Sequence, residues 1–249
     1  MTRLVRAEFL KLRTTQVWFW LLLAAVAIAA LLVIAPIASG DIHTRADVAD
    51  MFTGAGTSFV PVFVLGVLGV TTEFRYQTIT PTVLATPSRW AVVGAKMIAY
   101  GLVGVAYAVI CLGVQLAIAG PWLSAKGIDL PLTTDHVPRA LLSVFAVVSL
   151  FGIIGLGVGA LVKNQIVGVT VGVIFLLVIN NVLLAIPKVK SVFPYTPGGG
   201  INSLLTITGE RTANGVILLS PWGGVVVLVL WAFVPAILGA SITMNRDIT

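Results

Sequence analysis

The chain has 249 residues, of which 58% are hydrophobic and only 10% charged, with a mean hydropathy of +1.07. A soluble domain carries about 25% charged residues, so a water-exposed globule of this composition is excluded. The single cysteine, Cys111, excludes a disulfide scaffold, and the net charge of +6 points to anionic lipid and a cytoplasmic face rather than to nucleic acid. The composition predicts an all-α integral membrane protein.

The first predicted element is an interfacial amphipathic helix over residues 2–15. Its apolar residues Val5, Phe9 and Leu12 recur at helical spacing, while its arginines lie elsewhere around the helix. Such a helix lies in the inner membrane interface with its basic residues toward lipid phosphates. The alternative is a merely basic segment that only sets the topology.

Six uncharged runs follow, each long enough to cross a bilayer core of about 30 Å as a helix. They predict one transmembrane domain over residues 1–249, with spans at about 17–37, 56–72, 91–120, 140–162, 166–186 and 223–241. The first span, at 21 residues, exceeds the apolar core of a signal peptide, which is about 7–15 residues. We therefore expect the first span to be retained.

The distribution of basic residues predicts that both termini are cytoplasmic. In that topology nine of the 15 Lys and Arg residues lie inside and six outside, and four of the nine precede the first span. The long segment 187–222 then lies outside, and its apolar part, 201–207, is expected to lie on or dip into the outer membrane surface.

The loop between spans two and three is the most informative inner segment. Thr80 followed by Pro81 is typical of a helix start, and Pro87 prevents the helix from continuing. The sequence thus predicts a short, stiff cytoplasmic helix over Pro81–Ala85. This helix either binds another protein or is only a turn that connects spans two and three.

Catalytic and metal-binding motifs are missing from the sequence. There is no G-x-x-x-x-G-K-[ST] phosphate loop, so we expect no ATP site in this chain. His43 and His136 are isolated in outer loops with no second ligand at metal spacing. We expect no catalytic residues, no metal and no cofactor in this chain, and hence no enzyme activity of its own.

Polar groups at membrane depth are uncharged, because every charged residue maps to a span end or a loop. Asn180 and Asn181 in span five either join helices or line a solute route. The glycines of spans four and five either permit close helix packing or form a dimer seam. A charge relay, which an ion-coupled transporter usually needs, is not predicted.

Several short motifs resemble the ABC type 2 permease family, the membrane subunits of type V ABC exporters. The residues that carry the resemblance are Arg6-Ala-Glu-Phe-Leu-Lys-Leu-Arg-Thr14, Glu73-Phe-Arg-Tyr-Gln-Thr-Ile79, Ala85-Thr-Pro-Ser-Arg89, Gly94-Ala-Lys96, Tyr195-Thr-Pro197 and Ile201-Asn-Ser-Leu-Leu205. The inner-loop motif is the most specific of these.

The resemblance implies a coupling helix between spans two and three that docks on a separate ATPase subunit. The residues implied in coupling are Glu73, Arg75, Tyr76, Thr78, Ile79, Pro81, Val83, Leu84 and Arg89. ATP and Mg would be bound by the partner. Two ATPase copies and two permease chains, identical or homologous, would form one transporter in a bacterial plasma membrane.

The resemblance further implies that spans two and five line a solute route at the seam between permease chains. The candidates for that route are Phe59, Phe63, Thr170, Asn180 and Asn181. The function expected is export of an amphiphilic or hydrophobic solute such as a drug, lipid or peptide. The alternatives are a non-transporting membrane anchor or sensor subunit, and a secondary transporter.

Overall fold

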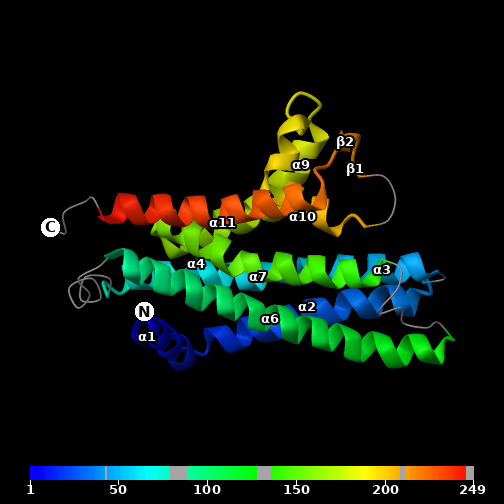
Figure 1. Cartoon of the computed structure of the whole chain (residues 1–249), viewed down its shortest axis with the longest axis horizontal. Coiled ribbons are helices and arrows are strands. Elements are labelled where there is room, and N and C mark those ends of the chain that lie inside the picture. Colours follow the sequence, from blue (N-terminus) through cyan, green and yellow to red (C-terminus); the bar gives the residue numbers. More distant parts are fainter. Residues whose placement is uncertain (43, 79–88, 128–135, 208–210, 245–249) are drawn as a thin grey trace.

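The computed structural model describes residues 1–42, 44–78, 89–127, 136–207 and 211–244 (Figure 1). The predicted helix over Pro81–Ala85 lies outside the described residues. The elements, in chain order, are α1 (Thr2–Thr14), α2 (Val17–Ser39), α3 (Arg45–Gly54), the 3-10 turn η1 (Ala55–Ser58), α4 (Phe59–Arg75), α6 (Arg89–Ala125), α7 (Val137–Val162), α8 (Gln165–Ile174), the π-helical turn η2 (Phe175–Ile179), α9 (Asn180–Ala185), the 3-10 turn η3 (Lys190–Tyr195), α10 (Pro197–Leu205), β1 (Thr212–Ala213), β2 (Val216–Ile217) and α11 (Pro221–Met244).

Within the described ranges, six helical segments are long and apolar enough to cross a membrane, which confirms the prediction of an all-α, multi-pass membrane protein. The second span differs from the expected one, because α3 and η1 run into α4 and extend the helical segment toward residue 47. The N-terminal helix α1 and the last turns of α11 lie at the same end of the bundle, called here the α1 end (Figure 1).

The helix boundaries follow from local chemistry. Gly40 ends α2 in the left-handed conformation, with φ of 84°, where a residue without a Cβ meets no steric penalty. The Asn164 side chain accepts a hydrogen bond from the Val167 amide at 3.1 Å and so caps α8. Thr196 caps α10 in the same way through the Gly199 amide.

Helix α7 forms the centre of the bundle and packs against α4, α6 and α11. Glycines bring its backbone unusually close to α4: a Cβ added to Gly155 would lie 2.0 Å from the Phe63 carbonyl oxygen, and one added to Gly66 would lie 2.2 Å from that of Gly152. The glycines of span four therefore permit close helix packing within one chain, which is the first of the two alternatives that the sequence left open.

The segment formed by α8, η2 and α9 departs from this compact arrangement. It rises from the bundle at a steep angle to the other spans (Figure 1). It is also among the least buried of the six, with 22% of its most apolar window buried, against 71% for the segment that contains α4. Span five thus exposes most of its apolar surface outside the chain's own core.

The segment over residues 187–222, called here the outer segment, folds back onto the bundle. Its helix α10 packs against α11, and Gly198, Gly199 and Gly200 are all buried there. The indole nitrogen of Trp231 donates to the Tyr195 carbonyl at 3.0 Å. The glycine run is therefore a packing feature, and residues 201–205 of the predicted apolar part, 201–207, belong to α10.

Candidate functional site

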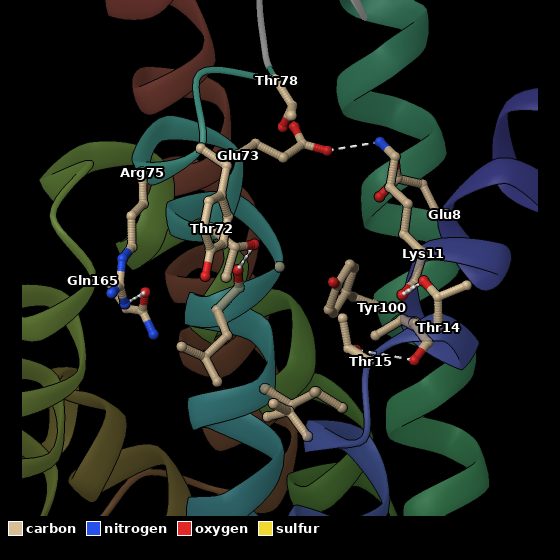
Figure 2. A pocket seen from close by; sticks show the side chains of 16 residues that line it. Glu8, Lys11, Thr14, Thr15, Thr72, Glu73, Arg75, Thr78, Tyr100 and Gln165 are labelled. Carbon is tan, nitrogen blue, oxygen red and sulfur yellow. Dashed lines mark hydrogen bonds and ion pairs between the residues drawn. The ribbon is translucent and has the colours of Figure 1, made fainter.

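Four charged side chains from three separate segments meet at the α1 end of the bundle. Lys96 Nζ of α6 lies 2.8 Å from Glu8 Oε2 of α1 and 2.7 Å from Glu73 Oε1 of α4. Lys11 Nζ of α1 lies 2.8 Å from Glu8 Oε1 and 2.7 Å from the same Glu73 Oε1. Figure 2 shows Lys11 and Glu73 pointing toward one another from α1 and α4. These four residues are called here the charge cluster.

The charge cluster is largely removed from solvent. The side chains of Glu8, Glu73 and Lys96 are 6%, 7% and 7% exposed, and that of Lys11 is half-exposed. Two carboxylates and two ammonium groups balance, so no net charge is buried. Lys96 also donates to the Gly69 carbonyl at 3.3 Å, which holds its ammonium group against α4. Because desolvated charges are stable only when paired, the cluster fixes α1, α4 and α6 relative to one another.

The pairing also decides the protonation of the two groups that α1 contributes. Burial of the Glu8 carboxyl tends to raise its pKa, but the neighbouring Lys96 and Lys11 ammonium groups outweigh burial and hold that pKa below its ordinary value. Burial likewise tends to lower the pKa of Lys11, while its hydrogen bonds to Glu73 and Glu8 raise it overall. Both groups are therefore charged at neutral pH.

The amphipathic pattern of α1 explains how Glu8 and Lys11 reach the cluster. Residues three apart share one face of a helix, and the buried residue Leu12 lies on the same side. Val5 and Phe9 pack against the main hydrophobic core, whereas Arg3, Arg6 and Arg13 are exposed. The predicted amphipathic helix is thus present, and its arginines point away from the chain's own core.

A cavity of about 440 Å³ opens beside the charge cluster between α1, α4 and α6. Its apolar wall is formed by Leu12, Val17, Leu65 and Leu68. Its polar wall comprises Glu8, Lys11, Thr14, Thr15, Thr72, Glu73, Arg75, Tyr76, Thr78, Tyr100 and Gln165, most of which Figure 2 labels. One oxygen of its polar wall, Glu73 Oε2, is buried and accepts no hydrogen bond in the described part of the chain.

The residues expected to couple to an ATPase begin at this site. Beyond Glu73, Arg75 donates to Gln165 Oε1 of α8 at 3.1 Å, and Tyr76 is 68% exposed. Gln77 leaves the helix with φ of 54°, and the amide of Thr78 donates to the Glu73 carbonyl at 3.0 Å. Arg89 is the first residue of α6. Ile79, Pro81, Val83 and Leu84 lie outside the described residues.

The residues expected to line a solute route are not brought together. Phe59 and Phe63 are buried in the chain's own core against Phe151, with ring centroids 4.2 Å and 6.4 Å from it. In this arrangement neither phenylalanine reaches a surface where a second chain could meet it.

The three candidates of span five lie on two sides of that segment. Thr170 and Asn181 are exposed. Asn180 is buried, donates to the carbonyls of Phe175 and Leu176, and packs on Gly198 of α10. Asn180 thus joins span five to the outer segment of the same chain, while Thr170 and Asn181 face outward.

Sequence reasoning missed the charge cluster. It placed every charged residue at a span end or in a loop, but it gave no indication that Lys96, in the second turn of the long helix α6, is buried. A signal was present, because the N-terminal motif, the inner-loop motif and the Gly94–Lys96 motif each contain a member of the cluster. Matching the opposite charges of three inner segments would have suggested that they meet.

Among the residues that the structure describes, no group of three His, Cys, Asp or Glu side chains could hold a metal ion. The six apolar helices and the charge cluster define a multi-pass membrane protein whose elements at the α1 end are joined by ion pairs.

A family model described as ABC-2 family transporter protein matches residues 4–181. The chain belongs to this family, as its motifs indicate, and it has the role of a membrane component in transport. The match runs from α1 into α9, so it includes all four residues of the charge cluster. A comparison with curated proteins found no match.

Proposed function

We propose that this chain is the membrane-spanning permease subunit of an ATP-driven exporter, powered by a separate ATPase that docks on the inner loop over residues 73–89. The observation that carries the proposal is the charge cluster. The inner loop leaves α4 within a few residues of Glu73, whose carboxylate is bound to both Lys11 and Lys96. A force applied to this loop therefore acts directly on three helices.

The exposed residues beside the cluster support docking at this place. Tyr76 projects from the end of α4, and the Arg75 guanidinium lies 5.7 Å from the centre of its ring. Arg75 also bonds Gln165 at the start of span five. Movement of the loop would thus displace α8 as well as α1 and α6, and α8 begins a span that is among the least buried of the six.

The exposed surface of span five supports the inference that a second permease chain packs against it. Its outward side chains are mainly apolar, and they include Ile166 at 76% and Val171 at 53% exposure, with Thr170 between them. A polar hydroxyl has a partner more readily at a helix–helix seam than in lipid. We place the solute route at this seam, lined by Thr170 and Asn181, and infer an amphiphilic or hydrophobic solute in a bacterial plasma membrane.

Replacement of Pro81–Ala85 by a Gly/Ser segment of the same length tests the proposal. We expect loss of solute efflux and of co-purification with the ATPase, while membrane insertion is kept. The matched control is Ile217→Ser in the exposed outer hairpin, where the side chain is 81% exposed. Efflux that survives the loop replacement would exclude an ATPase-driven role for the loop.

A further inference from the structure

Glu73, which lines the cavity beside the charge cluster, carries a buried carboxylate oxygen that nothing in the described chain satisfies. Glu73 Oε1 accepts from both Lys11 and Lys96, but Glu73 Oε2 is buried and accepts from neither. The side chain is more than nine-tenths buried and lines the cavity. An unpaired carboxylate oxygen is costly in such a place, so a ligand that donates a hydrogen bond here would relieve that cost.

Three threonine hydroxyls make the same wall rich in acceptors. Thr14 and Thr15 donate to the carbonyls of Lys11 and Leu12 at 2.9 Å and 3.0 Å, and Thr72 donates to that of Leu68 at 2.6 Å. Because each hydroxyl has one proton, these threonines offer only lone pairs to a further partner. A ligand in the cavity must therefore bring donors of its own.

The balanced charge of the cluster selects against ionic ligands. An ammonium group at Glu73 Oε2 would also face Lys11 and Lys96, and a phosphate at Lys11 would also face Glu8 and Glu73. A neutral hydroxyl avoids both repulsions. The apolar wall of Leu65, Leu68 and Val17 suits a hydrocarbon chain beside that polar end.

We propose that this cavity binds the neutral, polyhydroxyl headgroup of a membrane amphiphile, with one hydroxyl donating to Glu73 Oε2. Further hydroxyls donate to the threonine oxygens and accept from Lys11, and the acyl chain lies along Leu65 and Leu68. The site requires only this chain, so it does not depend on the proposed ATPase partner.

The test uses the full chain in phosphatidylcholine nanodiscs, with bound lipid counted by native mass spectrometry. The probes are a monoglucosyl diacylglycerol, the same lipid with all its sugar hydroxyls O-methylated, and phosphatidylethanolamine. Since a hydrogen bond to a charged group changes binding by about tenfold or more, we expect the glucosyl lipid to be retained at least about tenfold over the methylated one. Equal retention of the two, or stronger retention of phosphatidylethanolamine, would overturn the proposal without any variant.

Two variants of equal charge locate the binding. Glu73→Gln removes the charge from the unpartnered oxygen, and Glu8→Gln removes the same charge from a carboxylate whose two oxygens are already occupied by Lys11 and Lys96. We expect Glu73→Gln to reduce the preference for the glucosyl lipid at least fivefold more than Glu8→Gln does. Equal reductions, or none in either variant, would show that Glu73 Oε2 is not the recognition element.

Discussion

Lys96 Nζ lies 2.8 Å from Glu8 Oε2, although the two residues are 88 positions apart, and both side chains are buried. This ion pair joins the N-terminal helix to the third span. Because Glu73 shares the same lysine, the start of the inner loop is bound into the same unit. The relative position of α1, α4 and α6 therefore depends on a small number of charges, which makes it open to direct tests.

Lys96→Met should strongly destabilise the protein. The substitution leaves Glu8 and Glu73 buried with only Lys11 to balance them, and removing one partner of a buried pair costs about 3–5 kcal/mol. We expect a clear fall in the melting temperature of the detergent-solubilised chain, measured by intrinsic fluorescence.

The double variant Lys96→Met/Glu8→Gln is the control, because it restores neutrality to the remaining Lys11–Glu73 pair. It should recover part of the lost melting temperature. A single Lys96→Met variant that melts like the wild type would show that the buried pair contributes nothing to stability.

Docking of α1 should weaken in acid. The docked state lowers the pKa of Glu8 below its ordinary value of 4.5, so the docked helix favours the carboxylate. The contribution of the Glu8 carboxylate to the stability of the docked state is complete above about pH 4.5 and is lost as the pH falls through the docked-state pKa. A dye on Leu10→Cys, an exposed position of α1, should report release of the helix below that pH.

The same measurement on the Glu8→Gln background provides the contrast. Without an ionisable group at position 8, the acid transition of the dye should be smaller or absent. An unchanged transition would assign it to a group other than Glu8. The raised pKa of Lys11 predicts that its own contribution persists through neutral pH and is lost only above its ordinary value of 10.5.

Gly155→Ala should destabilise the contact between α4 and α7. The added Cβ would lie 2.0 Å from the Phe63 carbonyl oxygen, and backbone on both sides must shift to admit it. Overpacking of this kind costs about 1–3 kcal/mol. Gly113→Ala is the matched control, because nothing lies within 4 Å of its Cβ, and alanine should be neutral or stabilising there. Equal melting temperatures of the two variants would contradict this packing.

A second permease chain against span five predicts a specific cross-link. Val178 in η2 is 51% exposed on the proposed seam, and Leu142 in α7 is 69% exposed elsewhere. With a bifunctional maleimide in native membranes, Val178→Cys should form a permease–permease adduct and Leu142→Cys should not. The native Cys111 is buried and provides little background. Adducts of equal yield from both positions would place the second chain elsewhere.

The spans were predictable because hydrocarbon imposes a length and a composition that one sequence displays. The expected 140–162 and 17–37 differ from α7 and α2 by only a few residues. Close packing of span four was also visible as a glycine pattern, although the choice between an internal contact and a dimer seam needed the position of Phe63. Helix α3 was not predicted because it contains charged residues, such as Asp47 and Asp50, and the spans were predicted from uncharged runs.

The candidate site was predictable only in part. The inner loop could be identified from Thr80 and Pro81, but the pairing of Glu8 with Lys96 is a tertiary contact, and its only signal is the opposite charges of motifs that lie far apart in the sequence. Phe59 and Phe63 lie on the expected span, but they face the chain's own core. The sequence could not predict this orientation, because no periodic pattern distinguishes the two faces of a helix that is apolar all round.

The most direct test of the account is the environment of position 76, which ties the inner loop to a motor outside the membrane. In cells that produce Tyr76→Cys, we expect a membrane-impermeant maleimide to label the protein only after the plasma membrane is opened, and a short cross-linker at this cysteine to capture an ATPase subunit. Labelling of Tyr76→Cys in intact cells, with no captured ATPase, would contradict the account.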